Sequence, residues 1–364
     1  MNISIHILDT IDDIPMDQYI RFHEKSRSSF FYDWRLLQAA EKSPLLLTNK
    51  IWYLIAKNND ELCAFMPAYL QDLAVVDPFG VLKETANIIN EGTDTGLFSH
   101  IMHCFDSSIP SIAGNDAYAA ICSAFVRALE DIARDAGASY YGILNVAEPR
   151  LRQQAADMGL HVNHMLDRFY ADLTPFRDFA DLVAHLPRDA RQEMNRQLRK
   201  FDNSNIQASF LAPPFDDRLE ALCRLCFETT EKHGTPQYFP AVPLARFTRL
   251  CGDLVRLNVM EQDGQLVSGM ICFEEGKTLH LWSAGMRYDS SGFSPYSLCF
   301  AKAYEYAFEH GLQRIEAGRL NARIKLRLGF VPEPIYAITS ERLSTRPAMQ
   351  QARQPAINAN LARL

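Results

Sequence analysis

The most constraining feature of the sequence is an internal repeat. Residues 51–66 align without a gap to residues 255–270, at an offset of 204 positions. Each copy consists of two apolar runs separated by a short polar turn, which predicts a β-hairpin. The recurrence of one hairpin so far along the chain indicates that a single structural unit occurs twice.

Downstream of each hairpin the sequence predicts a helix and then a strand. In the first copy, apolar residues spaced by three and four predict a helix over 118–136, and a strand follows at 139–144. In the second copy the same pattern predicts a helix over 296–310 and a strand at 314–318. A glycine follows each helix, as is typical of helix ends.

Each copy closes with a short helix, a glycine followed by a large apolar residue, and a last strand. The pairs are Gly159-Leu160 and Gly329-Phe330, and the last strands are predicted at 168–173 and 335–339. The first copy also holds about 26 extra residues within 71–117. We expect this insertion to be a loop region that covers a cleft or builds an interface.

The repeat divides the chain into lobes of like fold. We predict an N-terminal lobe over 1–172, a C-terminal lobe with the active site over 173–343, and a tail or peripheral helix over 344–364. A length of 364 residues is sufficient for two domains with a core each. Each lobe is predicted to be α/β, with a mixed sheet and flanking helices.

Composition and charge exclude several classes of protein. The net charge of −7 provides no global positive field for nucleic acid or anionic lipid, so only a local basic patch could bind them. The eight cysteines lie mostly within apolar runs, which predicts reduced and buried side chains. No apolar run is long enough to span a bilayer and no secretory signal is recognisable, so we expect a cytoplasmic protein.

The sequence lacks the motifs of several enzyme classes. The P-loop, dinucleotide-binding, nucleophile-elbow and zinc-protease patterns are missing. Cys223 and Cys226 form a CxxC pair within a helical pattern, but no second ligand pair stands at metal spacing, so we expect both to pack in the core. No metal site is predicted.

Three stretches of the second lobe carry a resemblance to a known family. They are the basic helix at 186–196, the loop at 230–236, and the segment from Tyr296 through Glu316 and Lys325 to Pro332. With the order of elements above, they resemble the GNAT acyltransferase fold. Two such lobes in one chain are similar to the FemAB-like aminoacyl and acyl transferases. The resemblance implies two tandem GNAT-like lobes and acyl transfer.

The resemblance implies a donor-binding turn before the second-lobe helix. Ser294 is predicted to cap this helix and Pro295 to occupy its first position. Free N–H groups at a helix start bind anions, and in GNAT relatives this turn holds the diphosphate of coenzyme A. Asp289 stands here where the family has a basic residue, and an ordinary capped helix is the alternative. The donor-binding candidates are Trp282, Gly285, Arg287, Gly292, Phe293 and Ser294.

Lys325, Glu316 and Tyr296 are the catalytic candidates. Lys325 stands four residues before the Gly-Phe pair, where GNAT enzymes often have a tyrosine and FemAB-like enzymes have a functional lysine nearby. Its ammonium could stabilise a tetrahedral oxyanion, or it could be a solvated helix lysine. Glu316 could be a base, an ammonium anchor, or the partner of Arg319 or Arg287 in a buried ion pair. Tyr296 could line the cleft or belong to the core.

Four residues are candidates for substrate binding: Trp34, His233, Tyr238 and Arg191. Arg191 belongs to a basic set on the predicted helix that opens the second lobe, with Arg188, Arg196, Arg199 and Lys200. This set could bind phosphates of an acceptor or of a transfer RNA, or it could be a solvated charged face of the helix.

The leading hypothesis is an N-acyltransferase that moves an acyl or aminoacyl group from a donor of the acyl-CoA type to a small-molecule or peptide amine. The alternatives are a tRNA-dependent aminoacyltransferase of the FemAB type and a non-catalytic GNAT-fold binding protein. Acyl-CoA or aminoacyl-tRNA is the expected co-substrate, and no tightly bound cofactor is expected. Donor, acceptor and oligomeric state stay open at this point.

Overall fold

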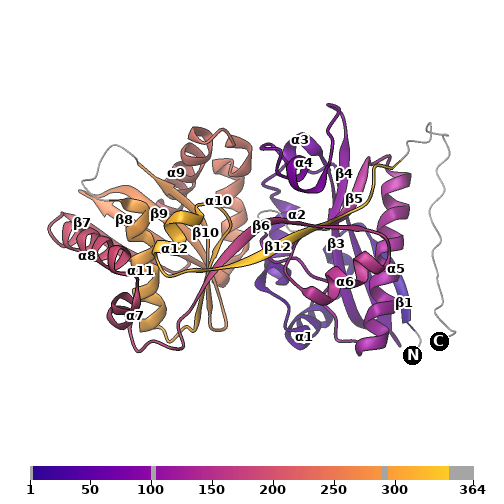
Figure 1. Cartoon of the computed structure of the whole chain (residues 1–364), viewed down its shortest axis with the longest axis horizontal. Helices are drawn as coiled ribbons and strands as arrows, with labels where there is room; N and C mark the ends of the chain where they lie inside the picture. Colours follow the sequence, from indigo (N-terminus) through magenta and orange to yellow (C-terminus); the bar gives the residue numbers. More distant parts are fainter. Residues whose placement is uncertain (1–2, 100–103, 288–293, 344–364) are drawn as a thin grey trace. The chain divides into compact units, whose positions relative to one another are not determined.

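The computed structural model describes residues 3–99, 104–287 and 294–343 (Figure 1). The chain divides into two compact units. Unit 1 comprises Met1–Met165 and Pro334–Leu364, and unit 2 comprises Leu166–Glu333. Each unit has its own strands, helices and buried apolar cluster, so the predicted α/β architecture with two like lobes is confirmed. The expected tail, 344–364, lies outside the described residues.

In unit 1 the strand order is β1-β2-β3-β4-β5-β12. These strands are β1 Ile3–Leu8, β2 Lys50–Asn58, β3 Glu61–Asp72, β4 Thr95–Ser99, β5 Tyr140–Val146 and β12 Val331–Thr339. The helices are α1 Met16–Ser26, α2 Trp34–Lys42, α3 Leu73–Val76, α4 Val81–Ala86, α5 Asn115–Asp135 and α6 Pro149–Asp157. Only the β4–β5 pair is parallel among the pairings described within this unit.

In unit 2 the strand order is β6-β11-β10-β9-β8-β7. These strands are β6 His161–Asp172, β7 Ile206–Leu211, β8 Val255–Gln262, β9 Gln265–Glu275, β10 Thr278–Met286 and β11 Arg314–Gly318. The helices are α7 Phe179–His185, α8 Arg188–Asp202, α9 Arg218–Lys232, α10 Ala241–Leu250, α11 Pro295–Glu309 and α12 Ala322–Arg327. The β10–β11 pair is parallel.

The two hairpins of the repeat are confirmed in geometric detail. The turn residues Asn59 and Asp60 have φ of 49° and 67°, and their counterparts at the offset of 204, Asp263 and Gly264, have φ of 50° and 74°. Two successive residues with positive φ form the type of turn that matches the twist of a hairpin. An irregularity in the pairing follows Ala56 in one hairpin and Met260, again at the same offset, in the other. The repeat therefore extends to backbone conformation.

The helices and strands predicted after each hairpin are also confirmed. The helix predicted over 118–136 is α5, the helix predicted over 296–310 is α11, and the strand predicted at 314–318 is β11 with the same bounds. Apolar residues at three-and-four spacing on α5, among them Ile121, Phe125 and Leu129, are fully buried. Burial of this stripe explains why the periodicity predicts the helix.

The last strand of each copy pairs with a strand of the other copy. Strand β6 follows the first copy, but its residues Phe169 to Asp172 pair with β11 of unit 2. Strand β12 follows the second copy, but its residues Tyr336 to Thr339 pair with β5 of unit 1. Ile338 of β12 is fully buried in the apolar cluster of unit 1. Each unit thus contains the last strand of the other copy.

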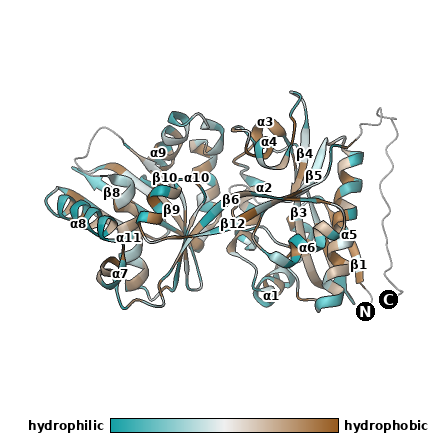
Figure 2. Ribbon diagram, viewed as in Figure 1, coloured by the Kyte–Doolittle hydropathy of each residue, from teal (hydrophilic) through white to brown (hydrophobic). Residues whose placement is uncertain are grey.

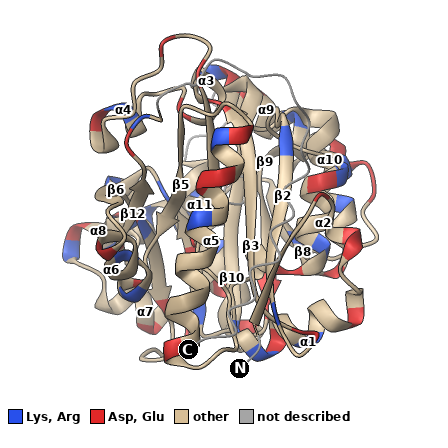
Figure 3. Ribbon diagram, turned by 90° about the vertical axis from the view of Figure 1, so that its right-hand side faces the viewer, with Lys and Arg blue, Asp and Glu red and all other residues tan. Residues whose placement is uncertain are grey.

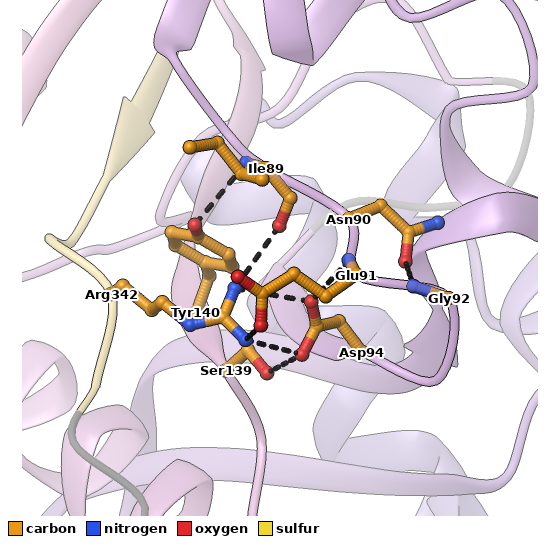
Figure 4. Close-up of polar contacts among 8 residues, drawn as sticks. All are labelled: Ile89, Asn90, Glu91, Gly92, Asp94, Ser139, Tyr140 and Arg342. Carbon is orange, nitrogen blue, oxygen red and sulfur yellow. Dashed lines mark hydrogen bonds and ion pairs between the residues drawn. The ribbon is translucent and has the colours of Figure 1, made fainter.

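Arg342, just after β12, connects the end of this strand to the loop before β4 (Figure 4). Its guanidinium donates to the two carboxylate oxygens of Asp94, at 2.7 and 3.0 Å, and to Glu91 at 3.1 Å. It also donates to the carbonyl of Ile89 at 3.2 Å, while Ser139 Oγ donates to Asp94 at 2.6 Å. A forked guanidinium on a carboxylate fixes both position and orientation. The network therefore anchors the insertion of the first copy.

We expect Arg342→Ala to loosen this insertion. Loss of the charge-assisted hydrogen bonds should lower the free energy of unfolding by about 2 kcal/mol and speed protease cleavage within 73–94. Limited proteolysis followed by mass spectrometry measures the cleavage. Arg342→Lys keeps the charge but not the fork and should give an intermediate rate. Equal cleavage of the wild-type protein and Arg342→Ala would contradict the anchoring role.

The prediction of buried, unpaired cysteines is confirmed: all eight are free thiols in buried positions. Within the described ranges, no helix combines the length and the apolar character that a membrane crossing requires. Figure 3 shows acidic and basic residues interspersed on the helices, including α5.

Candidate functional site

Strands β10 and β11 separate after a short parallel pairing. They pair only from Thr278–Arg314 to His280–Glu316, whereas β10 continues to Met286 along β9. The β9–β10 register shifts between Leu281 and Ser283, where β10 leaves β11. A bulge re-aims backbone groups and is frequent beside functional sites. We call the opening between residues 281–286 of β10 and the end of β11 the β10–β11 split.

Lys325 of α12 places its ammonium at the end of β11, beside this split. The residue is 1% exposed. Its Nζ donates to the carbonyl of Gly318, the last residue of β11, at 3.1 Å and to the carbonyl of Arg319. The ring of Phe169 on β6 lies 5.4 Å from Nζ. The interpretation of Lys325 as a solvated surface lysine is therefore wrong.

The surroundings of Lys325 favour its neutral form more than water does. Burial, and then the charge of Arg319, lower the pKa of Lys325 to about 7. Because a buried ammonium costs free energy, a lysine at this position reduces the stability of the fold. A residue that costs stability requires an explanation other than packing.

The first copy of the repeat supplies an internal comparison. Ala155 stands four residues before Gly159, as Lys325 stands four before Gly329, and it is fully buried. The same backbone bond closes both turns, from Leu160 N to the Ala155 carbonyl at 3.0 Å and from Phe330 N to the Lys325 carbonyl at 3.1 Å. The fold needs only a small apolar side chain at this position, so the lysine is not a requirement of the turn.

Glu316 belongs to an ion-pair network on β11. It is 5% exposed and accepts from Arg314 Nε at 2.7 Å. Arg314 also approaches Glu333 at 3.9 Å, and Glu333 accepts from Arg168 Nε at 2.8 Å. The sequence predicted an ion pair with Arg319 or Arg287, and the described ion pair is with Arg314, which lies two residues away on the same face of the strand.

His280, opposite Glu316 on β10, is buried beside this network. Burial, followed by the charges of Arg168 and Arg314, lowers the pKa of His280 to about 3. The imidazole is therefore neutral throughout the physiological range and does not serve as a proton donor there.

Tyr296 joins the start of α11 to the β11–α12 connection. Its hydroxyl accepts a hydrogen bond from Asn321 Nδ2 at 3.3 Å, and its ring packs edge-on against Phe300 at 4.9 Å. Asn321 in turn accepts from the backbone N–H of Lys325 at 3.2 Å. Tyr296 thus combines a ring in the core with a polar end near Lys325.

The capped helix start predicted at Ser294 and Pro295 is confirmed. Ser294 Oγ accepts from Ser297 N at 3.3 Å, and Pro295 is the first residue of α11. The N–H of Ser294 itself donates to Oε1 of the buried Gln197 on α8, at 2.8 Å. Pro295 has no N–H, so these two hydrogen bonds account for the N–H groups of Ser294 and Ser297 at the start of α11. Residues 288–293, which precede this helix start, lie outside the described residues, so the predicted donor-binding turn stays a prediction.

The other donor-binding candidates have different surroundings in the structure. Gly292 and Phe293 lie outside the described residues. Trp282 is half-buried and stacks on Phe247 at 5.5 Å. A Cβ on Gly285 would lie 2.5 Å from backbone atoms of α9, so this glycine permits close packing of helix on strand. Arg287 is exposed, and its Nη1 donates to Gln265 Oε1 at 3.2 Å.

The substrate-binding candidates do not form one cluster in unit 2. Trp34 is 7% exposed in unit 1, with the ring of Tyr19 at 5.5 Å. His233 is exposed at the end of α9, and Tyr238 is half-buried in the short turn that follows. Arg191 donates to the carbonyl of Ala184 at 2.7 Å and so satisfies the end of α7.

The basic set on α8 is mostly solvent-exposed. Arg188, Arg196, Arg199 and Lys200 are exposed, and Figure 2 shows α8 as a predominantly hydrophilic helix. Arg196 forms a forked pair with Glu193, at 2.7 and 2.8 Å. Hydrogen bonds from Arg196 and then Gln197 lower the pKa of Glu193 to about 2. Gln197, which links α8 to α11, and Asn321, which bonds to Tyr296, were not predicted from the sequence. Nothing in their spacing distinguishes them from other polar residues.

The family comparison identifies part of unit 2. Residues 188–326 match the model of the acetyltransferase (GNAT) domain. This range contains α8, β10, α11, β11 and Lys325. No curated protein matches the chain.

Solved structures match nearly the whole chain at low sequence identity. A tandem GNAT protein from the clavulanic acid biosynthesis pathway is 11% identical, with a TM-score of 0.56 over 95% of this chain and 100% of that one. FemX is 9% identical, with a TM-score of 0.58 over 91% and 96%. L-PGS from Bacillus licheniformis is 10% identical, with a TM-score of 0.55 over 90% and 92%. The chain therefore has the tandem GNAT-like fold.

Proposed function

We propose, for this chain with its tandem GNAT-like fold, that unit 2 transfers an acyl or aminoacyl group from an activated donor to an amine. The observation that carries the proposal is Lys325. It is a buried lysine at the β10–β11 split, whereas the same turn of the first copy is built with Ala155. Two carbonyls hold an ammonium that the fold does not require, and such an arrangement is typical of functional groups.

The geometry suits stabilisation of a tetrahedral intermediate. The amine nitrogen attacks the acyl carbon and the carbonyl oxygen becomes an oxyanion. Collapse of this intermediate breaks the bond to the leaving group of the donor, and the proton that the nitrogen loses passes, through solvent, to that leaving group. Two N–H groups of the Lys325 ammonium are directed to Gly318 and Arg319. We assign the third, for which no acceptor stands among the described residues, to the oxyanion, and such a preorganised donor is most effective where water is excluded.

The role as an ammonium predicts a specific pH dependence. Because the pKa of Lys325 is lowered to about 7, the charged form is present below pH 7 and is lost as the pH rises. We therefore expect kcat/KM to fall about tenfold per pH unit above pH 7. Lys325→Arg stays charged throughout this range and, where it retains activity, should lack the falling limb. A rising limb near pH 7 would instead assign Lys325 as a base.

An aminoacyl-tRNA is a second candidate for the donor. Helix α8 carries exposed basic residues, and its Gln197 accepts from the N–H of Ser294 at the start of α11. An aminoacyl-tRNA would place a phosphate backbone along such a helix. A transfer assay with acetyl-CoA, longer acyl-CoAs and aminoacyl-tRNA tests the two donors.

The two donors predict different responses to the same variant. With a tRNA donor, Arg199→Ala should raise KM and make it less dependent on salt. With an acyl-CoA donor, Arg199→Ala should leave KM unchanged. Transfer from none of the donors would overturn the proposed function.

A further inference from the structure

Leu320, between β11 and α12, has an unfavourable backbone conformation. Its φ is +64°, in the left-handed region. Of the eight non-glycine residues with positive φ in the described part of the chain, six are asparagine or aspartate, which tolerate this region. Arg27 ends α1, and Leu320 is the one with an apolar side chain. A branched aliphatic residue in this conformation costs free energy.

The Leu320 side chain does not compensate for this cost by burial. It is 61% exposed, and Ile324, four residues later on α12, is 38% exposed. An asparagine or glycine would suit the backbone better and would lose little buried apolar area. Packing therefore gives no reason for a leucine at this position.

The backbone on both sides of Leu320 is held by the candidate site. Before it, the carbonyls of Gly318 and Arg319 accept from Lys325 Nζ. After it, Asn321 donates to the Tyr296 hydroxyl and accepts from Lys325 N. Leu320 is thus fixed one residue away from a carbonyl that binds the ammonium. Strained conformations that are held in this way cluster at functional sites.

We propose that Leu320, supported by Ile324, is a specificity-determining contact for an aliphatic acyl group. This inference rests on the proposed function, in which the ammonium of Lys325 binds the oxygen of the acyl carbon. On this proposal the chain attached to that carbon lies toward Leu320, which directly follows the Arg319 carbonyl bound by Nζ. An aliphatic acyl chain would cover the two exposed side chains and so provide the burial that the fold lacks.

Binding of simple carboxylates tests the contact without turnover. Acetate and hexanoate present the same oxygens to Lys325 and differ only in four methylenes. We expect hexanoate to bind the wild-type protein at least about tenfold more tightly, as measured by calorimetry. Leu320→Gly should remove most of this preference without lowering the melting temperature, because it relieves the backbone. In the transfer assay, the same variant should reduce the kcat/KM preference for hexanoyl over acetyl donors about tenfold.

Leu326→Ala is the matched control. Leu326 is 49% exposed on the same helix but lies two residues, about 200°, from Ile324. This variant should retain the preference for hexanoate. If hexanoate binds no better than acetate, or if the preference survives in Leu320→Gly, the inference is overturned. If the preference depends on Leu320 but no donor is turned over, the contact stands and the proposed transfer fails.

Discussion

Lys325→Met is expected to reduce acyl transfer by on the order of a hundredfold while making the protein harder to unfold. The loss of activity follows from removal of one preorganised donor to the oxyanion. The gain in stability follows from removal of a buried lysine, since methionine has a similar length and no charge to desolvate. Methionine also leaves the carbonyls of Gly318 and Arg319 without this donor, so the gain should be smaller than the roughly 1–4 kcal/mol obtained when a whole buried ion pair is replaced by apolar side chains.

The stability gain has a defined pH dependence. The pKa of Lys325 is about 7 in the folded protein and 10.5 when unperturbed. Between these values the unfolded chain binds more protons, so the free energy of unfolding of the wild-type protein rises with pH. The advantage of Lys325→Met should therefore be largest below pH 7 and should vanish above about pH 10.5. Urea unfolding at several pH values measures this difference.

Lys277→Met is the control for loss of a lysine in unit 2. Lys277 is exposed in the turn between β9 and β10, so its replacement should change neither transfer nor the slope of stability with pH. The assignment fails if Lys325→Met retains transfer within threefold of the wild-type rate. It also fails if Lys325→Met is destabilised at neutral pH, because the lysine would then contribute to packing.

Gly142→Ala is expected to separate β5 from β12 and to destabilise unit 1 by roughly 3 kcal/mol or more. A Cβ at this position would lie 2.0 Å from the carbonyl oxygen of Ile338 and 3.0 Å from Cα of Thr339. Both contacts are with backbone, so no side-chain rotation relieves them. Hydrogen exchange should show lost protection in β5 and α5, while β8 and β9 of unit 2 keep theirs.

Gly114→Ala provides the matched control. Gly114 caps α5 with a φ of −63°, and a Cβ there would meet no heavy atom within 4 Å among those described. This substitution should change stability by less than about 1 kcal/mol. If the two variants unfold at the same urea concentration, the close approach of β5 and β12 does not stabilise unit 1.

The architecture could be predicted largely from the sequence, because the apolar periodicity and the turn residues within each copy of the repeat are local signals. The hairpin turns at Asn59-Asp60 and Asp263-Gly264 carry the residue types that positive φ requires. The stripe on α5 and the cap formed by Ser294 and Pro295 likewise depend on neighbours in the chain. Such features are encoded within a few residues.

The pairing of the last strands could not be predicted in this way. Both β6 and β12 have the apolar content of a buried strand, and nothing in either strand identifies its neighbour. The pairing depends on contacts far apart in sequence, such as Thr339 with Gly142 and Phe169 with Gly318.

The candidate site could be predicted only in part. The position of Lys325 relative to Gly329 identified the residue, but its burial follows from the carbonyls of Gly318 and Arg319 and from Phe169 on a distant strand. Gln197 was missed because the cap that it completes lies almost a hundred residues away. Arg314 was not predicted as a partner of Glu316, because only the β-strand geometry places the two side chains on one face.

Mass-spectrometric detection of an acylated amine tests the central claim most directly. The purified chain is incubated with a panel of acyl-CoA and aminoacyl-tRNA donors and a mixture of small-molecule and peptide amines, and Lys325→Met is treated in parallel. We predict a new amide product with the wild-type protein and at least about a hundredfold less with the variant. Equal product from both proteins, or none from the wild-type protein with any donor, would contradict acyl transfer at the β10–β11 split.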